Sequence, residues 1–303
     1  MAGWSPTPDV AAVLDRVGLW PLRVLWLIAP LVVGSGVGPA IDRFDDPGPV
    51  VAEVALWAGW FAGLVATLTP SAVSLTVCRI LAPGMAAVPL LAGVATGDWS
   101  PRLVAAIAGG LLIAAVAYLP LVGDRMVNGS AYGSERRMTL RPPAFVLLGP
   151  VELAWLVVFA GLVTGPFLLA SGRTALGTVA VVLGAGAVWL GGRALHQLAR
   201  RWVVFVPAGF VIHDHVIPAE SILLRRPNVE SLGPAPSPLG DDAVDLSGGA
   251  SGLALEVVVD EPVRFSRRIG GEVVSTEATR IVFTPTLPGA VLTEARVRAL
   301  RIG

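Results

Sequence analysis

Six long apolar runs fill roughly the first two thirds of the chain and end near residue 198. A helix needs about 20 mostly apolar residues to cross the hydrocarbon core of a bilayer, which is about 30 Å thick. The pattern therefore predicts an α-helical polytopic bundle with six transmembrane spans, embedded in a lipid bilayer. The six runs cover approximately residues 21–40, 50–69, 74–96, 103–122, 144–170 and 177–197.

The composition of the chain also indicates contact with lipid. Charged residues make up 15% of the 303 residues, whereas they make up about 25% of an ordinary soluble domain. The formal net charge at pH 7 is zero, so electrostatic attraction gives no reason to expect a nucleic-acid partner. All the basic side chains are arginines, a bias that is typical of proteins from GC-rich bacterial genomes.

Residues 1–20 precede the first run and predict an N-terminal interfacial segment. Their apolar side chains recur at the spacing of one helix face, and a helix of this kind lies on the membrane surface. No basic residue occurs in the first 15 positions, unlike in a secretory signal. A soluble lead-in is the alternative. The apolar positions are Val10, Val13, Leu14 and Val17.

Arginines in the short loops predict the orientation of the spans, because cytoplasmic loops carry an excess of basic residues. One side of the membrane collects nine arginines and the other side three. We therefore expect a multi-pass protein of the cell membrane with both termini in the cytoplasm. The nine are Arg16, Arg23, Arg125, Arg136, Arg137, Arg141, Arg193, Arg200 and Arg201, and the three are Arg43, Arg102 and Arg173.

Two charged side chains fall inside predicted spans, where an unpaired charge costs about 3 kcal/mol or more. Arg79 lies about five residues into the third span from its cytoplasmic end, and Glu152 about eight residues into the fifth. At 1.5 Å per residue their depths are about 8 and 12 Å, so the two could form an intramembrane polar pair. Such a pair would belong to a polar pathway or would only fix the orientation of the spans. Alternatively, Arg79 extends alone to the interface.

The loop between the fourth and fifth spans, residues 123–143, is the only sizeable loop between spans and is predicted to be cytoplasmic. Its Arg136 and Arg137 suit two roles. In the first, they enforce the topology and contact lipid phosphates. In the second, the loop docks against the soluble part of the chain, with both arginines meeting acidic residues such as Asp241 and Asp242.

Beyond Leu198 the hydrophobic pattern changes to an alternation of period two, which is typical of half-buried strands. The change separates a transmembrane domain, residues 21–198, from a soluble β-rich domain, residues 199–303. A final helix is expected from about Pro288 to Leu300. The predicted strands are Trp202–Val206, Phe210–His215, Ser221–Arg226, Ala243–Leu246, Leu253–Val259, Val263–Arg267 and Thr279–Thr284.

The stretch RWVVFVPAGFVIHDHVIPAESILLRR, which begins at Arg201, resembles the first three strands of bacterial pleckstrin-homology-like domains. Seven short strands followed by one helix is the order of that barrel, although the Pro/Gly-rich stretch Pro227–Gly240 departs from it and also suits a different small β fold. Domains of this family mostly bind peptides, partner proteins or lipid head groups. The resemblance therefore implies that four arginines contact anionic lipid or a partner, namely Arg200, Arg201, Arg225 and Arg226.

His213 and His215 are the most metal-like pair, because alternate residues of a strand project from the same face. No third ligand is identifiable, and the single cysteine, Cys78, lies in an apolar span. A solvated hairpin edge explains the two histidines as well. We therefore expect neither a metal nor a cofactor.

No nucleophile–base arrangement and no cluster of acids and histidines at one interface indicates an enzyme. We expect a non-catalytic anchoring, scaffolding or regulatory membrane protein whose cytoplasmic β domain binds a partner protein or lipid head groups. The alternative is a small-solute or ion transporter with a regulatory cytoplasmic domain. That alternative requires a water-accessible cavity at mid-membrane, lined by Arg79 or Glu152.

Overall fold

The computed structural model describes residues 17–269 and 272–303, so most of the predicted interfacial segment lies outside the described residues. The chain forms two compact units. The membrane unit comprises the described residues up to Met126 together with Glu152–His196, and the β unit comprises Val127–Val151 and Gln197–Gly303. The division differs from the predicted domains, because the β unit includes residues from the loop between two spans as well as the C-terminal part.

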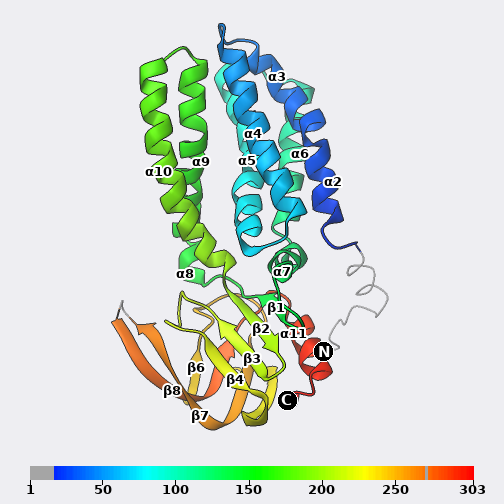
Figure 1. Cartoon of the computed structure of the whole chain (residues 1–303), viewed down its shortest axis with the longest axis vertical. Coiled ribbons are helices and arrows are strands. Elements are labelled where there is room, and N and C mark those ends of the chain that lie inside the picture. Colours follow the sequence, from blue (N-terminus) through cyan, green and yellow to red (C-terminus); the bar gives the residue numbers. More distant parts are fainter. Residues whose placement is uncertain (1–16, 270–271) are drawn as a thin grey trace. The chain divides into compact units, whose positions relative to one another are not determined.

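The membrane unit is helical (Figure 1). In the described part of the chain, five helical stretches are long and apolar enough to cross a membrane, and the pair α6–α7, bent by 59°, makes a sixth if it counts as one span. The chain is thus a multi-pass membrane protein. The helices are α2 (Trp20–Ala29), the π-helical η1 (Pro30–Gly34), α3 (Ser35–Ile41), α4 (Gly48–Leu68), α5 (Ala72–Thr96), α6 (Pro101–Ala117), α7 (Pro120–Asn128), α9 (Pro150–Ala170) and α10 (Thr174–Ala199).

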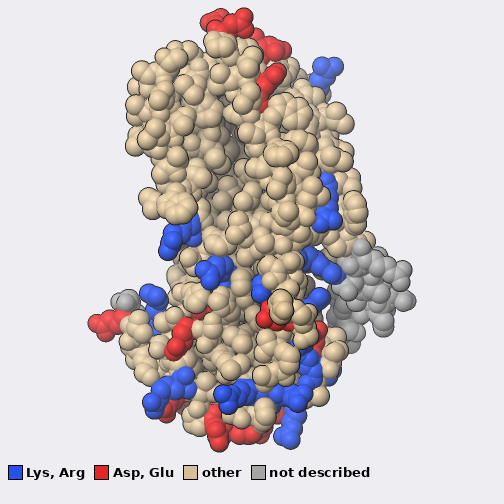
Figure 2. Space-filling view, in the orientation of Figure 1, with Lys and Arg blue, Asp and Glu red and all other residues tan. Residues whose placement is uncertain are grey.

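Charged side chains are sparse over the helices and frequent over the β unit (Figure 2). Large apolar side chains such as Leu31, Leu183 and Trp189 are 69–75% exposed on the helices. Exposure of this extent is unusual for a surface in water but normal for one in lipid. The surface of the helices therefore agrees with the apolar pattern of the sequence.

Two tryptophans connect α2 to α4 through reciprocal hydrogen bonds. The indole Nε1 of Trp26 donates to the carbonyl of Trp60 at 2.9 Å, and the indole of Trp60 donates back to the carbonyl of Trp26 at 2.8 Å. The ring of Trp26 is fully buried and lies directly against Gly63, where an added Cβ would be only 1.8 Å from the ring. A glycine is therefore required for this close approach.

The first sheet of the β unit is antiparallel and has the order β1-β2-β3-β4. The C-terminal sequence supplies β2–β4 close to the predicted positions. The first strand comes from the loop that precedes α9, where no strand was predicted. The strands are β1 (Arg136–Thr139), β2 (Trp202–Val206), β3 (Gly209–His213) and β4 (Ile222–Arg225).

The second sheet has the order β5-β7-β8-β6, with β6 parallel to β8. Two predicted strands are one long strand, β7, with a register shift between Val258 and Val263. The stretch Pro227–Gly240, in which no strand was predicted, contains β5. The remaining elements are η2 (Arg226–Asn228), β5 (Val229–Pro234), β6 (Ala243–Asp245), β7 (Leu255–Ile269), β8 (Glu272–Phe283), the short α8 (Ala144–Leu147) and the final helix α11 (Pro288–Val297).

Both sheets and α11 share one hydrophobic core. Alternate residues of β2, β3 and β4 point into it, as the period-two pattern predicts. Phe205, Phe210 and Phe283 are at most 1% exposed, and α11 covers the core with Val291 and Ala295. The strand pairings between the described residues do not close into a barrel.

Candidate functional site

The loop before α9 is a structural part of the β unit. Residues of β1 pair with β2 from Arg136 opposite Phe205 to Thr139 opposite Trp202. The backbone then crosses to the second sheet, because the amide of Arg141 donates to the carbonyl of Thr284 at 2.9 Å. The loop thereby connects the two sheets.

Among the ion pairs of the described residues, none joins the loop to Asp241 or Asp242. Arg137 forms an ion pair with Glu135 at 3.1 Å within the loop itself, and its guanidinium lies over the ring of Trp202 at 5.4 Å. Asp242, a predicted partner, instead lies 3.6 Å from Arg280. Backbone pairing and the contact of Arg137 with Trp202, rather than ion pairs with Asp241 or Asp242, therefore join the strand β1 to β2.

A buried ion pair lies where the two segments of the β unit meet. The guanidinium of Arg201 donates to Oδ2 of Asp214 at 2.6 Å and to the carbonyl of Arg141 at 2.6 Å. The other carboxylate oxygen of Asp214 accepts the amide of Val216 at 2.8 Å. Both charged side chains are 1% exposed. Arg201 therefore does not face lipid, contrary to the role that the sequence suggested.

His213 and His215 belong to an aromatic stack on the face of the first sheet that points away from the core. The ring of His213 lies parallel to Trp202, with centroids 5.1 Å apart, and meets His215 edge-on at 4.5 Å. Its Nδ1 is 2.8 Å from the hydroxyl of Ser221. Burial, together with His215 and Arg200, lowers the pKa of His213 to about 4. Among the described residues, no three potential ligands are grouped so that they could hold a metal ion.

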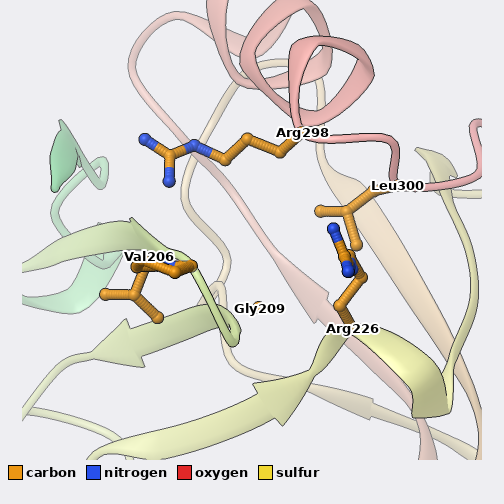
Figure 3. Close-up of a pocket in the computed structure, with 6 residues that line it drawn as sticks. Val206, Gly209, Arg226, Arg298 and Leu300 are labelled. Carbon is orange, nitrogen blue, oxygen red and sulfur yellow. The ribbon is translucent and has the colours of Figure 1, made fainter. Parts of the chain in front are cut away.

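A pocket opens at one end of the first sheet, between the β2–β3 turn and the end of α11 (Figure 3). Its volume is about 240 Å³. Two arginines, Arg226 from η2 and Arg298 from the end of α11, line it from different elements, and Gly209 lies between Val206 and Arg226 in this view. The remaining lining residues are apolar, namely Val206, Pro207 and Leu300.

The backbone shapes this pocket at two positions. Gly209 has φ +149°, and an added Cβ would lie 2.1 Å from the carbonyl oxygen of Leu224. Ala299 has φ +57° in the left-handed region, where a glycine usually ends a helix. The turn at Ala299 reverses the direction of the chain. The amide of Leu300 then donates to the carbonyl of Ala295 at 2.9 Å. Leu300 is thereby placed in the pocket wall.

The two arginines of the pocket differ in their partners. Arg298 donates through Nε to Glu294 at 2.7 Å and through a second nitrogen to the carbonyl of Ser134. Arg226 is exposed, and it takes part in none of the ion pairs between the described residues. The sequence indicated Arg226, but the contribution of Arg298 was not predicted. A basic residue at the C-terminal end of the predicted helix was the available signal.

The other predicted site residues lie apart from this pocket. The guanidinium of Arg79, in α5, lies over the ring of Tyr118 at 5.5 Å. Glu152 is in the first turn of α9, closer to the helix start than predicted, because the chain breaks after α8 at Leu148 and Gly149. Arg136 and Arg200 are half-buried, and Arg225 is exposed at the end of β4.

Comparison of the chain with protein-family models, with curated proteins and with solved structures finds no match. The fold therefore defines the protein at the level of a class. It is a multi-pass membrane protein with a C-terminal β-rich region of two sheets and a final helix.

Proposed function

We propose that this chain is a non-catalytic anchoring, scaffolding or regulatory membrane protein whose β unit binds a partner protein. The pocket at Arg226 and Arg298 carries the proposal, because an exposed guanidinium beside an apolar wall suits recognition of a polypeptide. In this proposal both termini and the β unit lie in the cytoplasm, as the arginine distribution of the loops indicates.

The way in which the β unit is attached supports a scaffolding role. Within the described residues, the chain passes between the membrane unit and the β unit three times, after Met126, Val151 and His196. A domain on a single linker has one covalent attachment, whereas the β unit has several. A partner bound to the β unit would therefore be tethered to a membrane protein through more than one segment of the chain.

The proposed fold of the β unit is a variant of the pleckstrin-homology-like arrangement. Antiparallel strands followed by the C-terminal helix α11 support this proposal. Two features depart from the simple order of that barrel, namely the strand β1 from the loop and the parallel strand β6. Binding without catalysis is the usual role of such domains, which is why we favour it here.

Site-specific photocrosslinking tests the proposed function. A benzoylphenylalanine at Ala208, in the exposed turn beside the pocket, should form a discrete adduct with a partner protein in cells that express the full-length chain. The adduct should be lost when Arg226→Glu is added. The same photoreactive residue at Leu239, which is 38% exposed elsewhere in the β unit, is the control. Identical adducts at both positions, unchanged by Arg226→Glu, would overturn the proposal.

A further inference from the structure

We infer that the pocket of Arg226 and Arg298 binds one carboxylate together with a neighbouring apolar side chain, as an acidic segment of a partner protein would present them. This inference rests on the proposed function and names the chemistry of the ligand. Three properties of the pocket support it, namely the guanidinium of Arg226, which has no ion-pair partner among the described residues, the apolar lining and the volume.

The charge of the pocket suits a ligand with a single negative charge. Arg298 is already bonded to the carboxylate of Glu294, so most of its charge is balanced. Arg226 supplies the one guanidinium in the pocket that has no ion-pair partner among the described residues. A guanidinium can hold a carboxylate through two parallel hydrogen bonds. A phosphate monoester carries about −1.5 to −2 charges near pH 7 and would remain partly unbalanced here.

The lining of the pocket favours a peptide over a phosphorylated head group. Val206, Pro207 and Leu300 present apolar surface, and Pro207 has no backbone N–H to donate. The additional oxygens of a phosphate would therefore lose hydrogen bonds to water without replacing them. An apolar side chain next to the carboxylate would instead bury its surface against these three residues.

The volume of the pocket agrees with this ligand. A cavity of about 240 Å³ is smaller than the roughly 300–1,000 Å³ of sites for drug-sized ligands. It accommodates one or two side chains rather than a whole small molecule. Arg298, fixed by Glu294 and by the carbonyl of Ser134, forms one wall of the pocket, and Arg226 lies on another wall with its guanidinium near Leu300 (Figure 3).

Peptide binding to the full-length protein in phosphatidylcholine nanodiscs tests the inference. The probe is a fluorescent peptide with the sequence Gly-Ser-Glu-Leu-Ser-Gly, capped at both ends. We expect Arg226→Gln to weaken binding about tenfold or more, because the two charge-assisted hydrogen bonds to the carboxylate are lost. Arg225→Gln is the matched control, because it removes the same charge from the adjacent residue, which does not line the pocket. That variant should change the affinity less than about twofold, within the range of surface charge effects.

Two further arms of the experiment identify the chemistry. Replacing the glutamate of the peptide by glutamine, or its leucine by serine, should each weaken binding to the unmodified protein. Equal weakening by Arg226→Gln and Arg225→Gln, or equal binding of the glutamine peptide, would overturn the inference. Arg226-dependent binding of inorganic phosphate or of phosphatidylglycerol nanodiscs, without peptide binding, would also overturn it in favour of a phosphate ligand.

The two proposals fail separately. If the Ala208 crosslink depends on Arg226 but the acidic peptide does not bind, the assignment of a carboxylate ligand is wrong and the binding function stands. If the crosslink shows no dependence on Arg226 and the peptide does not bind, both proposals are wrong.

Discussion

At the scale of single residues, Arg201 connects the two segments of the β unit, because its guanidinium pairs with Asp214 in one segment and donates to the carbonyl of Arg141 in the other. Arg201 begins the C-terminal segment of the sheet, Asp214 follows β3, and the carbonyl of Arg141 belongs to the loop. Removing one partner from a buried pair leaves an uncompensated charge, which costs about 3–5 kcal/mol. The pair is therefore a point at which one substitution should affect the whole unit.

We predict that Asp214→Asn lowers the unfolding temperature of the full-length protein in detergent by several degrees, because Arg201 remains buried without its carboxylate. The measurement is thermal unfolding followed by intrinsic fluorescence. Glu277→Gln is the control, because its partner Arg264 is 75% exposed and exposed pairs contribute less than about 1 kcal/mol. An equal effect of the two substitutions would show that the buried pair has no special role.

His213 should make the stability of the β unit depend on pH. Its pKa is lowered from 6.5 to about 4, chiefly by burial, so the folded protein binds the proton more weakly than the unfolded chain does. The stabilising contribution of the neutral ring is complete above pH 6.5 and is lost as the pH falls towards 4. We predict that His213→Gln reduces the loss of thermal stability between pH 6.5 and pH 4, relative to the unmodified protein. The same pH dependence in both proteins would contradict this prediction.

At the scale of elements, the contact of α2 with α4 depends on a single glycine. A Cβ at Gly63 would overlap the ring of Trp26, which is held by its bond to the carbonyl of Trp60. Overpacking of this kind costs about 1–3 kcal/mol.

We predict that Gly63→Ala lowers the thermal stability of the purified protein, whereas Gly59→Ala, one helical turn earlier, does not. A Cβ at Gly59 would meet no atom within 4 Å, and alanine favours helix over glycine by about 1 kcal/mol. Comparison of the two unfolding temperatures in the same detergent tests this prediction. A lower stability of Gly59→Ala than of Gly63→Ala would show that the close contact is absent.

The elements also show what the sequence could predict. Apolar length predicted the membrane helices, and period two predicted β2–β4, because each of these patterns is local. The strand β1 was not predicted, since Arg136–Thr139 becomes a strand only by pairing with β2, far along the chain. The same reason applies to Arg298, whose place in the pocket depends on the packing of α11 against the sheets. Long-range pairing, not local propensity, determines both.

At the scale of the whole molecule, the β unit cannot be separated from the spans by one cut. Its first segment, Val127–Val151, lies between two helices of the membrane unit, and its second segment begins at Gln197. A chain that ended at Leu198 would leave the core side chain Met138, now 5% exposed, without β2. Experiments on the β unit therefore require the full-length protein.

The loop before α9 contributes the strand β1 to the β unit, and a cross-strand disulfide provides a decisive test of this pairing. Arg137 lies opposite Val204 in the register of β1 and β2. In a Cys78→Ala background, the pair Arg137→Cys and Val204→Cys should form a disulfide in high yield, detected as a linked peptide by mass spectrometry. Tyr132→Cys with Val204→Cys is the control, because Tyr132 is 86% exposed outside the strand. A linked peptide at residues 137 and 204 and little at 132 is the expected result, whereas equal yields or no link at 137 would contradict the claim.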